Sequence, residues 1–236
     1  MSGELPTHAH VVIIGGGSIG CNIAYQLNLL GWTDGVVVER DKLTSGTTWH
    51  AAGEIVPGLL GAEWACEYYT YGRNLIADLE ARTGHATGWR QVGYIQPADT
   101  EERVEERRRA AVFMNRMGIE VHEISPAEAA KMFPVGDFST TLAAYWFPHE
   151  GRVNPVDMTM ALARGARGHG TRILQNTRVE QILTAHGRAV GVRTDQGDIA
   201  AEHVVIAAGM WWRQIGAAAG INLPLQAAEH YYLITE

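Results

Sequence analysis

At the start of the chain an unbroken apolar run gives way to apolar residues at helical spacing, and a second apolar run follows. Residues 11–14 (Val-Val-Ile-Ile) form an unbroken apolar run that ends in glycines, which is typical of a buried parallel strand. From Ser18 apolar residues recur at helical spacing as far as Gly31, which predicts a helix stopped by glycine. Residues 36–38 (Val-Val-Val) predict a second buried strand that ends at Glu39. The chain therefore opens with a strand–helix–strand unit of about thirty residues.

The rest of the chain predicts helices and strands in mixed order. Residues 41–61 are rich in Thr, Ser and Gly and have no period, which predicts a long loop with a function. No repeat or linker divides the chain, so a second domain must consist of insertions into the first. Helices are expected at 63–82, from 99, from 125 and at 154–168, and strands at 93–97, 142–147, 178–183, 189–194 and 199–206.

Composition indicates a globular protein. The 236 residues are 46% hydrophobic and 19% charged, and no uninterrupted apolar stretch approaches the length of a membrane span. The formal charge of −7 argues against a nucleic-acid partner, because binding to phosphates depends on clustered Lys and Arg. The charges at 101–109 alternate in sign and are expected on a solvated helix face.

Three further features of the sequence bear on the location of the protein, the state of its cysteines and metal binding. The first eight residues lack the basic and apolar parts of a secretory signal and the Arg of a mitochondrial presequence, so we expect a cytoplasmic protein. Cys21 and Cys66 lack metal-site spacing and are expected to be buried free thiols. The ten histidines show no His-x-x-x-His pair on a predicted helix, so no metal centre is expected.

The glycine motif G-x-G-x-x-G lies between the first strand and the first helix. Gly15 permits a tight turn, Gly17 lets the backbone approach a pyrophosphate, and Gly20 allows close helix packing. Unpaired N–H groups at the helix N-terminus then face the phosphates. Glu39, nineteen residues after Gly20, is placed to accept hydrogen bonds from ribose hydroxyls. The pattern predicts a dinucleotide site and fits NAD and FAD equally.

The segment that follows Glu39 distinguishes the two cofactors. Residues 44–53 (Thr-Ser-Gly-Thr-Thr-Trp-His-Ala-Ala-Gly) resemble the flavin-contacting loop of the dimethylglycine and sarcosine dehydrogenase family, whose members have the D-amino-acid-oxidase-like fold. The resemblance implies FAD, joined covalently to His50 through the flavin 8α carbon. It also implies cofactor contacts from the hydroxyls and N–H groups of this loop, although these hydroxyls could simply satisfy their own turn. The residues concerned are Arg40, Ser45, Gly46, Thr47, Thr48 and Ala52.

Later segments extend the resemblance to the end of the chain. Residues 204–209 (Val-Val-Ile-Ala-Ala-Gly) resemble the strand that returns beside the dinucleotide, and residues 149–155 resemble the turn into the next helix. Near the end, 229–235 has the alternation of a strand in the substrate-binding sheet. The implied cofactor contacts are Val179 near the adenine, Ala208, Gly209 and Trp211, and the implied catalytic residues facing the substrate are His230 and Tyr232.

Core packing is an alternative role for Tyr232, and Tyr94 is a weaker candidate for the same cavity. The resemblance implies an α/β fold with α+β insertions, in which a Rossmann-type FAD-binding domain (9–84 and 149–220) carries an inserted antiparallel substrate-binding sheet (85–148 and 221–236). Because the chain stops inside a predicted strand, we expect a fold truncated at the C-terminus, which is either a fragment or completed by a second chain.

The function implied is oxidation of a C–N bond in a small N-methylated amine or amino acid, such as dimethylglycine or sarcosine. Hydride transfer to FAD would leave an iminium that water hydrolyses to an aldehyde, and oxygen or an electron-transfer protein would accept the electrons. The alternative is a non-catalytic regulatory or scaffold subunit with the same fold. An NAD-dependent dehydrogenase would require the likeness of 44–53 to be accidental.

Overall fold

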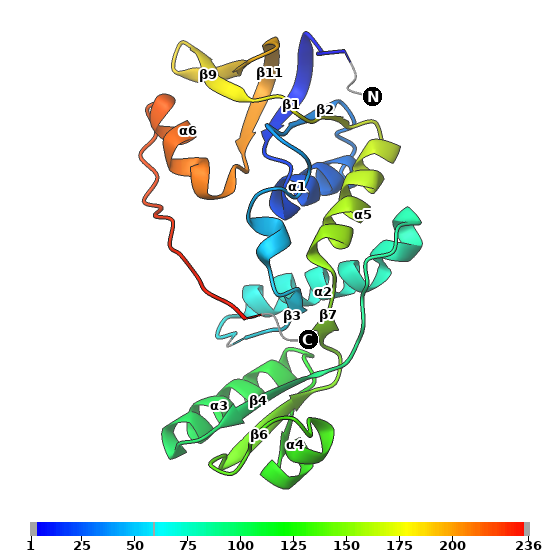
Figure 1. Cartoon of the computed structure of the whole chain (residues 1–236), viewed down its shortest axis with the longest axis vertical. Coiled ribbons are helices and arrows are strands. Elements are labelled where there is room, and N and C mark those ends of the chain that lie inside the picture. The colour runs from blue at the N-terminus through cyan, green and yellow to red at the C-terminus, as the bar shows by residue number, and fades with distance from the viewer. Residues whose placement is uncertain (1–3, 59, 234–236) are drawn as a thin grey trace. The chain divides into compact units, whose positions relative to one another are not determined.

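The apolar runs at the start of the chain form the centre of a sheet, as predicted. In the computed structural model, which describes residues 4–58 and 60–233, strand β1 (His8–Ile14) pairs in parallel with β2 (Gly35–Val38). Helix α1 (Ser18–Leu29) connects them (Figure 1). The valines of β2 are fully buried, which explains their unbroken apolar sequence.

The sheet has six strands in the order β8-β2-β1-β11-β10-β9. The first four strands in this order are mutually parallel, and β10 is antiparallel to both of its neighbours. The sequence predicted the last three strands of the chain but missed β8, which is only three residues long. The bounds are β8 (Arg172–Leu174), β9 (Val179–Ala185), β10 (Arg188–Thr194) and β11 (Gly197–Ile206).

Helices cover this sheet and complete its core. Helix α5 (Pro155–Gly168) packs against α1, and α6 (Trp212–Ala218) packs on β9 and β11. The side-chain amide of Asn28 on α1 donates to the carbonyl of Ala166 at 2.8 Å and to the hydroxyl of Thr171 at 2.9 Å, which ties α1 to the end of α5. The buried core consists of Ala9, Val12, Ile14, Val36, Val38, Leu174, Ile182, Val192, Ile199 and Ala201.

The middle of the chain forms a second compact unit with its own core. A three-stranded antiparallel sheet, β4-β6-β5, packs against α3, and a short ladder joins β3 to β7. The elements are β3 (Glu54–Ile55), α2 (Glu63–Thr83), β4 (Tyr94–Ala98), α3 (Glu101–Arg116), β5 (His122–Ile124), α4 (Pro126–Met132), β6 (Ala143–Phe147) and β7 (Gly151–Arg152).

Several local predictions are confirmed. Ser125 and Glu128 form a complete capping box at the start of α4. Most charges on α3 are exposed, the half-buried Arg107 excepted, and several pair along the helix, as in the ion pair between Arg109 and Glu105 at 2.7 Å. Both cysteines are buried free thiols, and burial raises the pKa of the Cys21 thiol to about 12. None of the helices within residues 4–58 and 60–233 is long and apolar enough to cross a membrane.

The compact units divide the chain at different places from those expected. The first unit is Met1–Ala51 with Pro155–Glu236, and the second is Ala52–Asn154, whereas the expected boundaries lay at 84/85, 148/149 and 220/221. Residues 52–84 belong to the second unit because Cys66 on α2 is buried in its core with Met114 and Tyr145. The assignment of cofactor and substrate roles to parts of the chain stays a prediction.

The strand predicted at 229–235 is wrong for its described part. Residues 221–233 form no helix or strand, Tyr231 is 91% exposed, and Thr235 lies outside the described residues. Alternating side chains favour a strand only where a neighbour pairs with its backbone groups, and the sequence pattern cannot supply that neighbour. The expected loop at 41–61 is confirmed in outline for its described residues, 41–58 and 60–61, but it contains the 3₁₀ helix η1 (Thr47–His50) and β3.

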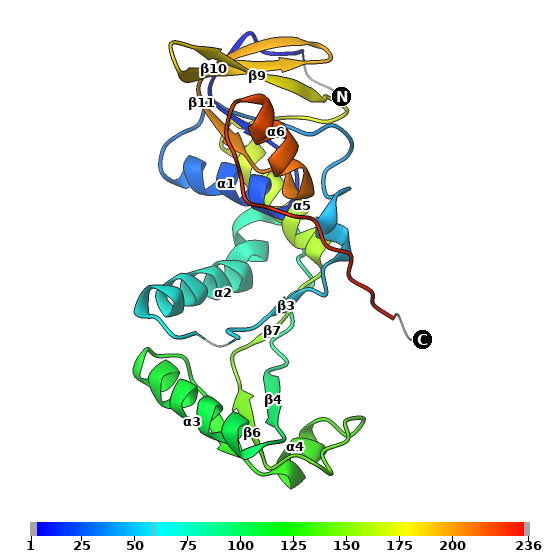
Figure 2. The same cartoon turned by 90° about the vertical axis from the view of Figure 1, so that its left-hand side faces the viewer.

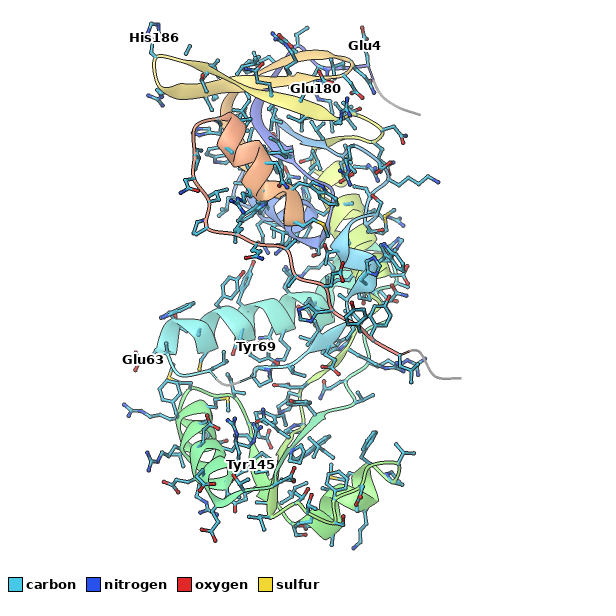
Figure 3. All side chains as sticks on the ribbon, turned by 60° about the vertical axis from the view of Figure 1, so that its left-hand side comes forward. Glu4, Glu63, Tyr69, Tyr145, Glu180 and His186 are labelled. Carbon is cyan, nitrogen blue, oxygen red and sulfur yellow. The ribbon has the colours of Figure 1, made fainter. Side chains whose placement is uncertain are left out.

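A fully buried carboxylate lies in the second unit. The Glu150 side chain contacts Arg73 of α2, whose guanidinium nitrogen Nη1 is 3.5 Å from each carboxylate oxygen. Burial raises the pKa of Glu150, and the neighbouring Tyr69 (Figure 3) and Arg73 act in the opposite direction. The folded state therefore binds the Glu150 proton more tightly than the unfolded chain does.

This predicts a pH-dependent contribution to stability. The contribution of Glu150 is fully present below the unfolded pKa of about 4.3 and is lost as pH rises through the higher folded-state pKa. Replacing Glu150→Gln should remove this loss. As pH rises from 4 to 7, the urea midpoint of the wild type should therefore fall relative to that of the variant. Glu80→Gln, an exposed change on α2, is the control; parallel curves for wild type and Glu150→Gln would contradict the prediction.

Candidate cofactor-binding site

Two glycines of the motif are required by the backbone itself. Gly15 has a φ of +113°, and a Cβ atom there would collide with the main-chain carbonyl of Ala207 at the end of β11. A Cβ atom on Gly20 would collide with the carbonyl oxygen of Gly15. The first glycine thus lets β1 and β11 end side by side, and the second lets α1 start directly against the turn.

Gly17 differs from these two positions. It is the N-cap of α1, with φ −82° and ψ −175°, a conformation open to any residue. The one atom that a Cβ would approach is Thr48 Oγ1, at 3.0 Å. The absent side chain leaves open the space in front of the helix N-terminus, which is the cradle that a pyrophosphate requires.

The N-terminus of α1 carries donors and a partial positive charge. The N–H of Ser18 donates to Thr48 Oγ1 at 3.0 Å, and regular helical bonding begins where the N–H of Cys21 donates to the carbonyl of Gly17. Apart from the N–H of Ser18, the donors of the first turn before Cys21 have no partner within the helix, so they favour an anion. The geometry at this end of α1 fits a bound phosphate group.

Glu39 links the glycine turn to the loop that follows β2. Its Oε2 accepts from the N–H of Gly16 at 2.7 Å, and its Oε1 accepts from the N–H of Asp41 at 2.9 Å. A carboxylate offers about four lone-pair directions, so acceptor capacity remains for two hydroxyls. The predicted role on ribose is therefore compatible with the structural role that Glu39 already has.

A cavity of about 430 Å³ opens beside these groups in the first unit. Figure 2 shows the region, where β9, β10 and β11 lie above α6 and α1. Its volume is in the range typical of small-molecule sites. The lining residues expected from the sequence are Gly15, Gly17, Glu39, Arg40, Ser45, Gly46, Thr47, Thr48, Val179, Ala208, Gly209 and Trp211.

One pair of these residues joins the two sides of the cavity. The Arg40 guanidinium carbon lies 3.8 Å from the ring centroid of Trp211, which is the geometry of a cation–π contact. Arg40 comes from the loop after β2 and Trp211 from the 3₁₀ turn η2 (Gly209–Trp211) after β11. The contact therefore holds together two loops that the chain separates widely.

His50 lies next to the cavity residues, at the end of η1. The described residues that line the cavity include Ala51 but not His50. The exposed His50 ring packs on Trp49 with 3.6 Å between centroids, and its Nδ1 is 3.2 Å from the hydroxyl of Tyr232. The structure thus brings together two residues that the sequence assigned to the flavin and to the substrate.

Other predicted residues lie apart from the cavity. Gly20 acts within the turn, and the side chain of His230 is exposed in the irregular segment 221–233. Ala52 belongs to the second unit, and Tyr94 packs against Phe147 in the core of that unit. The roles expected for His230, Ala52 and Tyr94 stay predictions.

Sequence reasoning missed several lining residues. Arg178 directly precedes β9, and Gln214 and Ile215 come from α6, a helix of seven residues. A helix this short covers two turns and shows no clear periodicity, so no signal in the sequence marked it. Ser18, Ile19 and Ala51, which adjoin predicted residues, also line the cavity.

The glycine turn, the acid after the second strand and the cavity define a dinucleotide-binding α/β protein. The family model of FAD dependent oxidoreductases, DAO, matches residues 10–236, and the chain belongs to this family. The resemblance and the fold class expected from the sequence are confirmed.

Relatives with named activities match the chain from end to end. It is 36% identical to human mitochondrial sarcosine dehydrogenase over 241 residues, which cover 100% of the chain and 26% of that protein. It is 35% identical to rat mitochondrial dimethylglycine dehydrogenase over 232 residues, covering 98% of the chain and 27% of the relative. The chain therefore spans about a quarter of the length of these relatives.

A regulatory protein matches almost as well. The mouse mitochondrial pyruvate dehydrogenase phosphatase regulatory subunit is 34% identical over 233 residues, covering 98% of the chain and 26% of that protein. Among solved structures, L-proline dehydrogenase from P. horikoshii has a TM-score of 0.86 at 30% identity, over 92% of this chain and 57% of that one. Identity alone thus does not separate a catalytic from a regulatory protein.

The contrast between the glycines predicts two kinds of variant. Gly20→Ala should destabilise the fold by about 1–3 kcal/mol, because its methyl group meets the Gly15 carbonyl. Gly17→Val should fold and lose FAD binding, because its side chain fills the space in front of α1. Thermal unfolding and flavin absorbance after gel filtration measure the two effects.

Gly72→Ala is the matched control, because a Cβ atom on this α2 residue would meet nothing within 4 Å. It should leave both properties unchanged or raise stability slightly, since alanine favours helix. Full FAD binding by Gly17→Val would contradict the assignment of the cradle.

Proposed function

We propose that the protein containing this chain oxidises a C–N bond of a small N-methylated amine or amino acid, of the dimethylglycine or sarcosine type, with FAD as cofactor. The observation that supports this most strongly is the match of the whole chain to two dehydrogenases named for such compounds. The cavity with its glycine turn and Glu39 supplies the matching cofactor site.

Different residues around the cavity would contact different parts of FAD. The N-terminus of α1 and the loop at 45–48 would hold the diphosphate, and Glu39 would accept hydrogen bonds from ribose hydroxyls. Val179 and Arg178 would meet the adenine, and Ala208, Gly209 and Trp211, which line the same cavity, would contact other parts of the cofactor. When bound, FAD supplies the acceptor for the hydride equivalent that leaves the carbon next to nitrogen.

The protein's other tasks are positioning and control of water. The substrate carbon must be held against the flavin, and water must then hydrolyse the oxidised C–N bond to an aldehyde and the demethylated amine. The two electrons pass on to oxygen or an electron-transfer protein. Tyr232 and His230 are proposed to face the substrate, and the 3.2 Å contact between Tyr232 and His50 supports this for Tyr232. The cytoplasmic location stays a prediction.

A substrate panel tests the proposed reaction. We expect sarcosine or dimethylglycine to bleach the flavin absorbance of the full-length protein under anaerobic conditions, with release of formaldehyde and the demethylated product. Glycine is the matched control, because it lacks only the N-methyl group. Bleaching restricted to alcohols or to unmethylated D-amino acids would refute the substrate class. A flavin that no amine reduces would favour the regulatory role, for which the 34% identical subunit is the precedent.

We also propose that His50 is joined to the flavin. The loop lines the cavity at Thr48 and Ala51, and His50, eleven residues after Glu39, lies between these two. A neutral imidazole nitrogen is a competent nucleophile. The new bond replaces a hydrogen on the 8α methyl carbon and one on the ring, so it is an oxidation whose two electrons go to the electron acceptor. Such a link raises the electron affinity of the flavin and favours amine oxidation.

Mass spectrometry of the acid-denatured full-length protein tests the link. The wild type should be heavier by one FAD, less the hydrogens lost in forming the bond, and His50→Ala should lack this increase. His230→Ala is the matched control and should retain it, because this exposed histidine lies outside η1. Release of all yellow colour into the acid supernatant of the wild type would refute the link.

A further inference from the structure

A group of metal-ligating side chains lies on the first unit outside the cavity lining. His10 is on β1, and Glu202 and His203 are on the neighbouring parallel strand β11. The register of these strands, in which Val11 pairs with His203, places the three residues at adjacent positions. The proposed oxidation uses none of the three.

The distances among the three side chains fit a metal ion. One ligand atom from each lies within 4.8 Å of the others, and His10 Nε2 is 3.5 Å from Glu202 Oε2. Bonds of about 2.0–2.1 Å in a tetrahedral zinc site place neighbouring ligand atoms about 3.3 Å apart. The pair of His10 and Glu202 is already close to this spacing, and the exposed His203 needs only a side-chain adjustment.

Trp32 orients the His10 imidazole and lies close to that of His203. It is half-buried, and its ring stacks on His10 with 4.2 Å between centroids and an interplanar angle of 6°. The same indole lies 5.3 Å from the ring of His203. A fixed ring orientation lowers the entropy cost of ligation, as outer contacts do at known metal sites.

The alternative to a metal site is a surface ion pair of His10 and Glu202 beside the stack of His10 on Trp32. Exposed ion pairs contribute little to stability, and the side chains of His10 and Glu202 are 38% and 59% exposed. An ion pair gives no reason for a second imidazole within reach of the same point. Two imidazoles and a carboxylate that converge from adjacent strands are instead a ligand set that suits zinc, copper or nickel.

We propose that His10, Glu202 and His203 bind a divalent transition-metal ion, Zn²⁺ or Cu²⁺, with water in the remaining coordination positions. The ion would join β1 to β11, the two strands whose ends meet at the glycine turn. Binding would therefore stabilise the first unit by mass action.

Calorimetric titration of the untagged full-length protein with ZnCl₂ tests this site. The wild type should bind one more equivalent of Zn²⁺ than His203→Ala, or bind the same equivalent at least about tenfold more tightly. Loss of an outer contact alone lowers the affinity of metal sites by about 10–100-fold, and loss of a ligand should lower it at least as much. Glu202→Gln, which keeps the side-chain volume, should give the same loss. Both changes are at exposed positions and should leave thermal unfolding without metal unaltered.

His186→Asn is the control, because His186 lies at the exposed turn between β9 and β10 (Figure 3), has a φ of +51° and belongs to the same unit. Asparagine tolerates that backbone, so Zn²⁺ binding should equal that of the wild type. Identical Zn²⁺ titrations of the wild type, His203→Ala and Glu202→Gln would overturn the proposal, as would no binding by the wild type.

Tryptophan fluorescence gives an independent readout. Cu²⁺ quenches the emission of a neighbouring indole. One equivalent of Cu²⁺ should therefore remove the part of the wild-type emission that Trp32 supplies, which is the part that Trp32→Phe lacks. His203→Ala should need a higher Cu²⁺ concentration for the same quenching. Quenching that is the same in Trp32→Phe and the wild type would place the ion elsewhere and refute the site.

Discussion

The close approach of three strand ends at Gly15 is the constraint on which the rest of the first unit depends. The N–H of Gly15 donates to the carbonyl of Val38 at 2.9 Å, and the N–H of Ala207 donates to the carbonyl of Ile14 at 2.8 Å. β1, β2 and β11 therefore stay paired up to the point where the chain turns. Any side chain on Gly15 would separate β11 from the turn and remove one wall of the cavity.

Residues around this point combine structural and ligand-binding capacity. Glu39 fixes the position of the Gly16 N–H while keeping lone pairs toward the cavity, and Thr48 does the same for the N–H of Ser18. Such residues preorganise the site, because the loops are held before any ligand arrives. The cation–π contact between Arg40 and Trp211 likewise holds the loop after β2 against the turn after β11.

Most elements of the first unit could be predicted from the sequence because the signals for them lie close together in the chain. The glycine spacing, the apolar runs and the acid at Glu39 depend on neighbours within one strand–helix–strand unit, and all lie as expected. The edge strand β8 and the helix α6 were missed because three and seven residues carry little periodicity.

Long-range relations were harder to predict. The packing of α2 in the second unit depends on Cys66 meeting partners some fifty to eighty residues away, and no local pattern encodes this. The metal-ligating group was missed for the same reason, since His10 and His203 come from opposite ends of the chain. A search for histidine pairs within one helix finds only ligands that are close in sequence.

The division of the first unit between the two ends of the chain has a consequence for biosynthesis. β1 can pair with β2 as soon as both leave the ribosome, but its other edge waits for β11, because Ala9 pairs with Ala201. The whole second unit, Ala52–Asn154, is translated in between. During that interval a strand edge of apolar residues is without its partner, which is a hazard for aggregation. Nascent chains of this fold should therefore depend on protection by chaperones until β11 has been made.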